Sequence, residues 1–405
     1  MRVDLPRTTL RHGDGRCLFV YGEHGPTTAL SAGDGPPHGL HLRHDALTDT
    51  WIGVSPARNT RPLTTGAENV SGSASAALNS AEPPPSCPLC PGGPEVPFPY
   101  TAATFENRFP SLVLDPPAAP HLEGATAPSA GRCEVVLYTS QHTGSLASLS
   151  PVRLASVIAI WADRSQELWQ DPEIAHVMVF ENRGDAVGAT IDHPHGQIYA
   201  FDRLPPLTRD RVATLRAHRD THDRCLSCSV VALDQAAEGR HVLENDSFTV
   251  TIPFAARWPY EVHVRARRHG LGRLHQMTAD ERRDLAHALR GVVTAYDALY
   301  ERPLPYMMTV MEAPNDDAGA VQDWHLAFEF LPPNRAVDRM KVRASVETAT
   351  GFFINDTVPE RTAHDLIAAL AAAGGAPELP VVDIVIEHLP EGAAIAPPGQ
   401  RRPLG

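Results

Sequence analysis

The sequence predicts an α+β protein that contains two tandem halves. Three observations support this: segments with strand periodicity, two long amphipathic helices, and an order of motifs that occurs twice along the chain. The predicted strands cover residues 134–139, 176–181, 197–201, 247–252, 261–265, 306–311 and 324–331. With 405 residues, of which 42% are apolar, the chain is long enough for two domains or for one large duplicated domain.

Both long helices have recognisable first turns. The first is expected to begin after Ser150, a favourable N-cap, with Pro151 at the first helical position. The second opens with a capping box formed by Thr278 and Glu281. Apolar residues recur at helical spacing in both segments, so each helix should have one apolar face.

The order of motifs repeats when the two Cys-x-x-Cys pairs are superposed. In each half, 16 residues separate the second cysteine from the glutamate of a Glu-Asn pair: Cys90 from Glu106, and Cys228 from Glu244. A strand that ends in a histidine, a long helix and a strand region with a further histidine follow in both halves, and each half ends in Leu-Pro-Pro. We infer that one unit has been duplicated.

The two halves differ at a position that matters for chemistry. Aligned in this way, residues 193–197 (HPHGQ) correspond to residues 325–329 (HLAFE). The first histidine is present in both halves, whereas His195 is matched by Ala327. The repeat therefore predicts a reactive histidine in the first half only.

We expect the two halves to form mixed or antiparallel sheets with flanking helices. The predicted parts are an N-terminal extension (1–45), a first half with the histidine motif (46–206), a second, degenerate half (207–360), and a C-terminal helix and tail (361–405). Segments rich in Gly, Pro, Ala and Ser are predicted to be loops or linkers, at about 23–38, 63–86, 115–132 and from about 389 onward.

The overall charge argues against two classes of partner. Acidic residues outnumber basic residues by 48 to 35, and the net charge of -13 disfavours nucleic acid or an anionic membrane as the main partner. The N-terminus lacks the apolar stretch of a signal peptide, and no segment approaches the roughly 18 apolar residues of a membrane helix. We therefore expect a cytoplasmic protein whose six cysteines do not form a disulfide framework.

Four of the cysteines form two Cys-x-x-Cys pairs, which hold two thiolates at a spacing suited to a tetrahedral ion. Zinc is the expected metal. The first predicted site consists of Cys87, Cys90, His142 and His193, and the second of Cys225, Cys228, His269 and His325. One such pair alone could be a chance or redox pair, but two pairs with matched histidines favour metal. Because the protein supplies all four ligands, both sites should be structural.

The segment 180–197 (FENRGDAVGATIDHPHGQ) combines a strand, a loop with two glycines, and a histidine pair around a proline. Glycines such as Gly184 and Gly188 allow backbone N–H groups to approach phosphate oxygens closely. A neutral imidazole is a competent nucleophile toward phosphorus near pH 7, and its phosphoramidate is reactive enough to return the group. His195 is therefore the predicted nucleophile of a group transfer at phosphorus.

This segment resembles the active-site motif of the galactose-1-phosphate uridylyltransferases, the transferase branch of the histidine triad superfamily. The resemblance covers roughly residues 45–360 and includes the segments 51–62, 87–90, 105–110 and 253–259. It implies two histidine-triad-like halves, with His195 as nucleophile and Gln197 as a donor to a non-bridging phosphoryl oxygen. It also implies substrate contacts from Arg58 and Arg61 near the phosphates, Asn182, Gly188 and Thr190 in the phosphate loop, Phe105 and Asn107 near the base and ribose, and Lys341 near the sugar phosphate.

The implied reaction is a ping-pong uridylyl transfer. UDP-glucose would give uridylyl-His195 and glucose 1-phosphate, and galactose 1-phosphate would then accept the uridylyl group to give UDP-galactose. Gln197 favours transfer over hydrolysis, because histidine triad hydrolases carry a third histidine there and a glutamine cannot act as a general acid. The resemblance also implies a homodimer.

Two alternatives stay open. Relatives with two zinc sites include a nucleotide-sugar phosphorylase that acts on ADP-glucose, so one alternative is an adenylyl-preferring transferase or phosphorylase that uses the same histidine chemistry. The other is a non-enzymatic, zinc-stapled nucleotide-binding protein, although a pure binder has no need of the HPHGQ motif. Some family members bind iron through a glutamate and three histidines; the matching positions here are Arg211, Met311, Ala327 and Glu329, so no iron site is expected.

Overall fold

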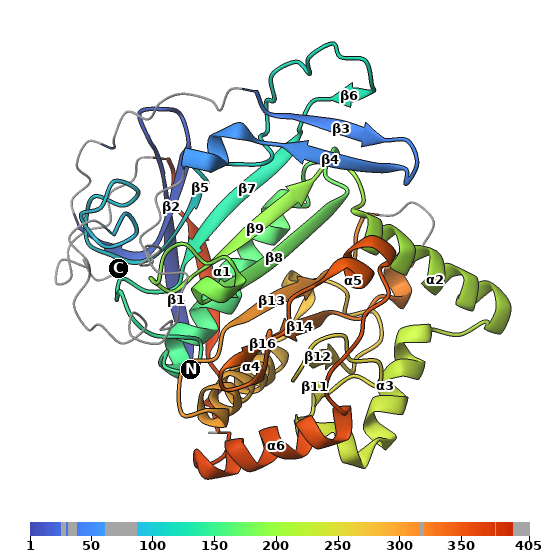
Figure 1. Cartoon of the computed structure of the whole chain (residues 1–405). Helices are drawn as coiled ribbons and strands as arrows, with labels where there is room; N and C mark the ends of the chain where they lie inside the picture. The colour runs from blue at the N-terminus through green and yellow to red at the C-terminus, as the bar shows by residue number, and fades with distance from the viewer. Residues whose placement is uncertain (26–29, 31–38, 61–86, 316–319, 377, 392–405) are drawn as a thin grey trace.

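The computed structural model describes residues 1–25, 30, 39–60, 87–315, 320–376 and 378–391 (Figure 1). The strands of its main sheet are β1 (Arg2–Arg11), β2 (Cys17–His24), β5 (Tyr100–Glu106), β7 (Gly131–Leu137), β8 (His176–Arg183), β9 (His195–Phe201), β10 (His241–Glu244), β11 (Phe248–Thr251), β12 (Val262–Ala266), β13 (Tyr306–Met311), β14 (Ala327–Leu331) and β17 (Asp383–His388). Smaller sheets contain β3 (His41–Asp45), β4 (Thr50–Val54) and β6 (Thr126–Ala127), and β15 (Asn334–Ala336) and β16 (Arg339–Met340). The helices are α1 (Pro151–Leu168), α2 (Pro206–His222), α3 (Leu226–Ala236), α4 (Ala279–Leu299), α5 (Ser345–Thr350) and α6 (Pro359–Ala372).

One sheet runs through both halves of the chain. Within the described residues it has 12 strands in the order β10-β11-β12-β14-β13-β8-β9-β7-β5-β2-β1-β17. Neighbouring strands are antiparallel, except that β1 and β17 run parallel. A mixed sheet with flanking helices confirms the predicted α+β class.

The two halves meet at the centre of this sheet. β8 of the first half pairs with β13 of the second, so that Phe180 lies opposite Thr309. Outward from this pair, β9 and β7 on one side correspond to β14 and β12 on the other. β9 begins at His195 and β14 begins at Ala327, two positions that the sequence repeat aligns.

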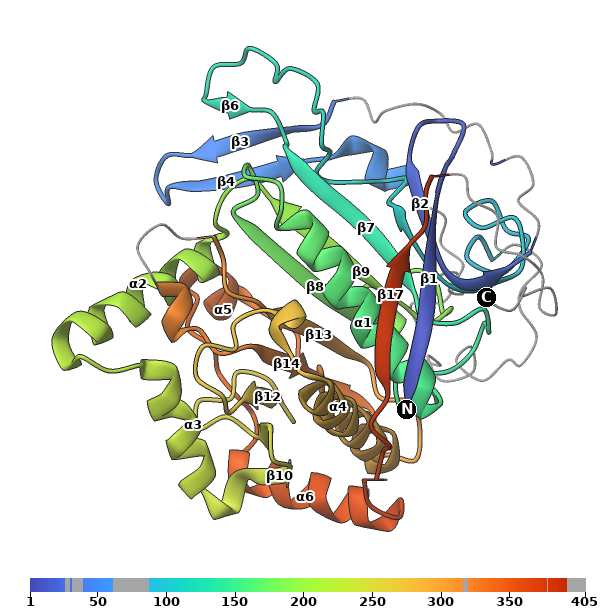
Figure 2. The same cartoon turned by 180° about the vertical axis from the view of Figure 1, so that it is seen from behind.

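Helices α1 and α4 lie across one face of the sheet (Figure 2). Both predicted caps form: the Ser150 side chain accepts a hydrogen bond from the N–H of Arg153, and Thr278 and Glu281 make the reciprocal bonds of a capping box. The apolar faces of both helices, including the fully buried Trp161, join the inward side chains of the strands in the main hydrophobic core. Burial of this apolar area is the principal driving force for the packing. Among the described residues, no helix has the length and apolarity that crossing a membrane requires.

The terminal segments add three strands to the main sheet that the sequence pattern did not predict. β1 and β2 come from the predicted N-terminal extension, and β17 pairs with β1. The guanidinium of the buried Arg7 in β1 binds Asp163 at 2.9 Å and Glu167 at 2.5 Å on α1. β1 and β2 form a local hairpin, but the partners that join it to the sheet, β5 for β2 and β17 for β1, lie far along the chain, so local periodicity does not reveal those pairings. The segment 115–132, predicted as loop, also contains β6 and the first residues of β7.

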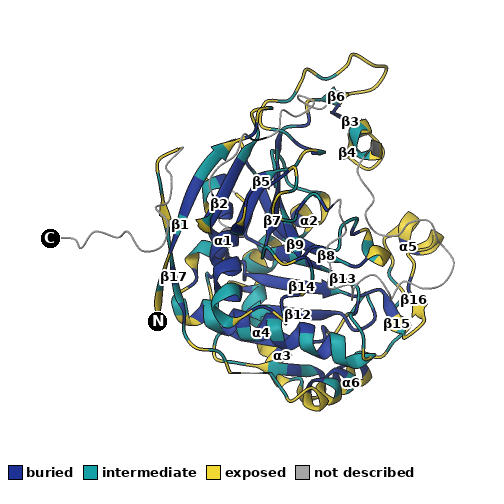
Figure 3. Cartoon of the chain, turned by 90° about the vertical axis from the view of Figure 1, so that its left-hand side faces the viewer, coloured by how far each residue is buried: buried dark blue, intermediate teal, exposed yellow. Residues whose placement is uncertain are grey.

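Side-chain burial alternates along β9. Buried residues gather along the strands of the sheet (Figure 3). Ile198 and Ala200 belong to the core that includes α1, whereas His195, Gln197 and Tyr199 are half-buried on the opposite face. Because strand side chains alternate between faces, these three side chains share the face that the helices α1 and α4 leave uncovered.

Candidate active site and metal centres

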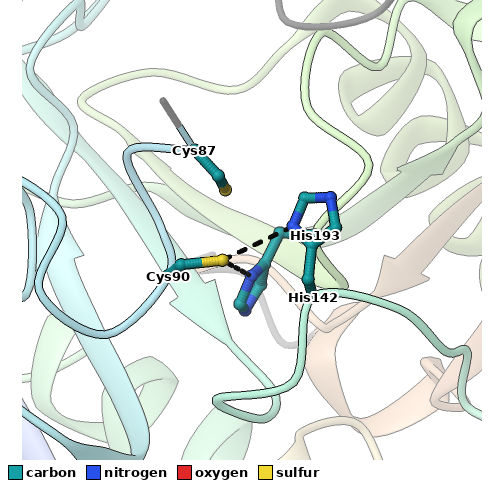
Figure 4. Close-up of side chains that lie close together, drawn as sticks. All are labelled: Cys87, Cys90, His142 and His193. Carbon is teal, nitrogen blue, oxygen red and sulfur yellow. Dashed lines mark hydrogen bonds between the residues drawn. The ribbon is translucent and has the colours of Figure 1, made fainter. Parts of the chain in front are cut away.

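The four ligands predicted for the first zinc converge beside the start of β9 (Figure 4). Cys87 and Cys90 lie on the loop before β5, His142 follows β7, and His193 lies two residues before β9. The ligand atoms of all four residues lie within 4.8 Å of one another. Sγ of Cys90 is 3.5 Å from Nδ1 of His142 and 3.5 Å from Nδ1 of His193.

These separations suit a tetrahedral zinc ion. With Zn–S bonds of about 2.3 Å and Zn–N bonds of about 2.0–2.1 Å, a sulfur and a nitrogen at two corners of the tetrahedron lie about 3.5 Å apart. Burial and the neighbouring Cys87 raise the pKa of the Cys90 thiol to about 12, so a cation is needed to hold both sulfurs as thiolates. Burial lowers the pKa of His193 to about 4, which keeps this imidazole neutral, as a metal ligand must be.

Backbone contacts fix the shape of this centre. Nε2 of His193 lies 2.8 Å from the carbonyl oxygen of Thr139, so that Nε2–H donates and Nδ1 faces the sulfur. Gly93 closes the cysteine turn, because its N–H donates to the carbonyl of Cys90 at 2.8 Å. A Cβ at Gly93 would lie 2.6 Å from the carbonyl oxygen of Pro88, so a larger residue does not fit there.

The second cluster has the same composition and a different histidine geometry. Cys225 and Cys228 lie at the start of α3, His269 follows β12, and His325 precedes β14. Sγ of Cys228 is 3.4 Å from Nδ1 of His269 and 3.3 Å from Nε2 of His325. His325 presents Nε2 to the cluster because its Nδ1 lies 2.8 Å from the carbonyl oxygen of Ala266. The structure therefore brings together both sets of predicted zinc ligands.

His195 lies at the start of β9, two residues after a ligand of the first cluster. Its Nδ1 is 2.7 Å from the carbonyl oxygen of His193, so that Nδ1–H donates and Nε2 keeps its lone pair. Burial lowers the pKa of His195, which leaves the ring neutral near pH 7. The carbonyl group that orients His195 thus belongs to a residue of the first Cys/His cluster.

A small cavity of about 50 Å³ lies beside His195. It is lined mainly by residues 142–146, 181–184 and 191–195. The cavity therefore lies between the first metal centre and the loop that follows β8, with the predicted phosphate contact Asn182 in its wall. Burial raises the pKa of Asp192, another wall residue.

The loop after β8 depends on its two glycines. Gly184 and Gly188 have φ values of 90° and 85°, which side-chain-bearing residues rarely adopt. Gly188 caps the short 3-10 turn at 185–187 and does not itself line the cavity. Thr190 lies between Ala189 and Ile191, both of which line it.

Two further side-chain contacts extend the site along β9. Nδ2 of Asn107, the residue after β5, is 3.5 Å from Oε1 of Gln197. Nη1 of Arg58, in the helical turn after β4, donates to the Tyr199 hydroxyl at 3.0 Å. Because residues 195, 197 and 199 share one face of the strand, the imidazole of His195, the amide of Gln197 and the Arg58 guanidinium at Tyr199 follow one another along that face.

Two predicted substrate contacts lie away from the cavity wall. Phe105 is 2% exposed and packs in a hydrophobic cluster with Leu18 and Val135, away from the cavity wall. Lys341 is buried and its ammonium group pairs with Glu347 at 2.6 Å, and it does not line the cavity either. Phe105 is held by apolar packing and Lys341 by an ion pair, and their substrate contacts stay predictions. Arg61 lies outside the described residues.

Two family models match most of the chain. Residues 37–205 match the N-terminal domain of galactose-1-phosphate uridyl transferases, and residues 211–343 match their C-terminal domain. The chain belongs to the galactose-1-phosphate uridylyltransferase family. The galactose-1-phosphate uridylyltransferase of Thermotoga maritima is 37% identical over 330 residues, which cover 81% of this chain and 98% of that protein. The enzyme of the same name from Streptomyces lividans is 36% identical over 264 residues, or 62% of this chain and 70% of that protein.

Solved structures share the fold of this family member. A structure of uridylyltransferase superposes with a TM-score of 0.70 and 29% identity, covering 82% of this chain and 99% of that one. An ADP-glucose phosphorylase from Arabidopsis thaliana, solved with bound ADP-glucose, has a TM-score of 0.58 and covers 81% of this chain and 99% of that one. At 22% sequence identity, the similarity of the phosphorylase to this chain shows a shared fold and nothing more. β1, β2, β17 and α6 lie outside the segments that the family models match.

The second half of this family member has ion pairs at the position that corresponds to Gln197 in the first half. Glu329, which the repeat aligns with Gln197, lies 2.8 Å from Arg211 and 2.9 Å from Arg257. Although burial opposes its ionisation, His263 and the two arginines hold the pKa of Glu329 well below its usual range. Two of the positions considered for iron ligands are thus paired with each other.

Sequence reasoning missed two residues that shape the site. Tyr199 contacts Arg58. Because Tyr199 lies two positions beyond Gln197 on a strand, its side chain could have been predicted to lie on the same face as Gln197. Thr139 orients His193 through its backbone carbonyl, which no side-chain pattern signals.

Proposed function

We propose that this chain transfers a uridylyl group between UDP-glucose and galactose 1-phosphate through His195. The observation that carries the proposal is the 2.7 Å contact between Nδ1 of His195 and the His193 carbonyl oxygen, which presents Nε2 as a neutral nucleophile. Membership of the galactose-1-phosphate uridylyltransferase family supports the choice of nucleotide and sugar phosphate.

The proposed first step forms a bond between Nε2 and the α-phosphorus of UDP-glucose. The bond from this phosphorus to the bridging oxygen breaks, and glucose 1-phosphate leaves with the electron pair. The imidazole becomes positively charged, and its Nδ1–H stays bound to the His193 carbonyl, which stabilises that charge. In this mechanism the amide N–H of Gln197, two residues along β9, donates to a non-bridging oxygen of the uridylyl group.

In the second step a phosphate oxygen of galactose 1-phosphate attacks the same phosphorus. The P–N bond breaks, its electrons return to Nε2, and UDP-galactose leaves. Because Gln197 has no acidic proton to give, the site is suited to wait for this acceptor rather than to activate water.

We also propose that both clusters bind zinc and that the metal is structural. The fit of the Cys90 separations to a tetrahedral ion supports the first site, and the matching separations at Cys228 support the second. Zinc at the first site would anchor His193 and so the carbonyl that orients His195. Elemental analysis should find two zinc equivalents per chain; one equivalent, or iron, would contradict the assignment. A reducing cytoplasm, where we expect the protein to work, keeps such thiolates available.

We further propose a homodimer. Exposed apolar side chains gather on the segment 340–354, including Val342, which is 75% exposed, and Phe352, which is 69% exposed. Exposed apolar patches of this kind often mark interfaces between subunits. Sedimentation should give a dimer, and the double change Val342→Glu and Phe352→Glu should give a monomer; a monomeric wild-type protein would refute this part.

The catalytic proposal is tested by trapping the intermediate. After incubation with UDP-glucose alone, intact-protein mass spectrometry should detect one uridylyl group on His195, and ADP-glucose should leave less adduct. His195→Asn should abolish the adduct and lower transfer by roughly 10³-fold or more, while both zinc equivalents remain. His364→Asn is the matched control, because His364 is a surface residue with its side chain 84% exposed. A preference for ADP-glucose would favour the adenylyl alternative, and full activity of His195→Asn would refute the mechanism.

A further inference from the structure

The turn between β1 and β2 carries a partly buried arginine that the reaction above does not use. Arg16 closes this turn, where its carbonyl accepts from the N–H of His12 at 2.9 Å. Its side chain is only 14% exposed. The guanidinium Nε donates to Asp14 in the same turn at 2.8 Å. Residues 12–16 lie outside the segments that the family models match.

One end of this guanidinium holds the first metal loop. Nη1 of Arg16 donates to Oε2 of Glu95 at 2.8 Å. Glu95 follows the cysteine turn directly, and its N–H donates back to the carbonyl of Pro88, between the two cysteines, at 3.4 Å. The side chain of Glu95 is only 8% exposed, so its charge has little access to water if this partner is removed.

The same nitrogen also holds the end of β5. Nη1 of Arg16 donates to the carbonyl oxygen of Glu106 at 2.9 Å, and the N–H of Cys17 donates to the Glu106 carboxylate at 2.7 Å. The next residue is Asn107, whose amide contacts Gln197. One partly buried guanidinium therefore links the N-terminal hairpin, the metal loop and the end of β5, which is followed by Asn107.

We propose that Arg16 is a positioning residue that fixes the first metal loop against the end of β5. It acts through Glu95 on the retention of the first zinc, and through Glu106 on the placement of Asn107. A planar guanidinium can donate hydrogen bonds to a carboxylate and a carbonyl at fixed angles. A lysine ammonium on a flexible side chain holds two such acceptors less rigidly. The part that concerns Asn107 rests on the proposed function, whereas the part that concerns zinc does not.

The test compares Arg16→Met and Arg16→Lys with wild-type protein. Arg11→Met is the matched control, because Arg11 lies in the same hairpin but is 55% exposed and paired with the 58% exposed Glu391. Zinc release into a metallochromic chelator is followed by stopped-flow absorbance. Arg16→Met should release the first zinc about 10-fold to 100-fold faster than wild-type protein does, because an outer contact of that metal site is lost. It should release the second zinc at the wild-type rate. Arg16→Lys should lie between the two.

A second readout separates positioning from general loss of structure. With UDP-glucose, Arg16→Met should raise KM several-fold and leave kcat within about threefold. The reason is that the change displaces Asn107, a proposed substrate contact, while the His193 carbonyl still orients His195. Cys225→Ser disrupts the second cluster and leaves the first intact. Zinc release from this protein therefore shows whether the faster-released equivalent is the first zinc.

Wild-type release rates for both equivalents in folded Arg16→Met would overturn the proposal, as would equal acceleration of both, which indicates general destabilisation. If Arg16→Met does not fold, Glu95→Gln, which removes the same ion pair at constant size, must show the selective release. If no uridylyl transfer is found with any variant, the proposed function fails, yet the zinc-release result still decides the role of Arg16.

Discussion

Substitution of Gly196 by alanine is expected to disturb the site more than its size suggests. Gly196 lies between His195, the proposed nucleophile, and Gln197 on β9. A Cβ at this position would lie 2.2 Å from the Tyr138 hydroxyl oxygen and 3.0 Å from the carbonyl oxygen of Phe180. The Tyr138 ring packs edge-on against Trp161, with centroids 5.7 Å apart, and therefore cannot swing away without moving the core.

The magnitude follows from this clash. To reach ordinary van der Waals contact, the ring or the strand must move by about 1 Å. Overpacking of this kind in a core costs about 1–3 kcal/mol of stability. A displacement of about 1 Å at a catalytic group can lower the rate by about 10²-fold. Gly196→Ala should therefore unfold at lower urea concentration and lose about 10²-fold in uridylyl transfer.

Two controls make the result decisive. Gly53→Ala places the same methyl group on β4, where the nearest atom is the Leu42 Cδ2 at 3.9 Å, and should change stability by less than about 0.5 kcal/mol. Adding Tyr138→Phe to Gly196→Ala removes the clashing oxygen and should restore about 1 kcal/mol in a double-mutant cycle. Equal urea midpoints for Gly196→Ala and Gly53→Ala, or no coupling with Tyr138→Phe, would refute the reasoning.

Three further outcomes are expected. Burial opposes the ionisation of Glu167, but Arg164 lowers its pKa from 4.5 to about 2, so its stabilisation is present above pH 4.5 and is lost as the pH falls toward 2. After discounting for a side chain that is 35% exposed, Glu167→Gln should remove about 1 kcal/mol of this acid-sensitive stability, measured by urea unfolding at pH 7 and pH 3; an unchanged pH dependence would contradict it. Ser150→Ala and Thr278→Ala should each cost about 1 kcal/mol in thermal unfolding, and no loss in either would argue against the caps. Cys225→Ser should reduce the zinc content from two equivalents to one and still form the uridylyl adduct; loss of both metals would show that the two centres are coupled.

Local spacing was sufficient to predict much of the site. A Cys-x-x-Cys pair places two sulfurs on one turn, so the sequence alone named Cys87 and Cys90, and the order of motifs supplied their histidine partners. The helix caps at Ser150 and Thr278 could also be predicted from the sequence, because a cap is an interaction between residues close together in the chain. The alignment of the two halves also predicted that only one of them carries the nucleophile.

The sequence by itself thus determined the residue types and the order of parts, including the HPHGQ motif, both ligand sets and the two long helices. The tertiary structure alone decided which face of β9 becomes the site, that Phe105 is buried in the core, and that β1 pairs with β17. It also decided that Arg16 bridges the metal loop and β5. The physical reason is that these features are contacts between segments far apart in the chain, and such contacts are set by packing and hydrogen bonding in the folded state rather than by local periodicity.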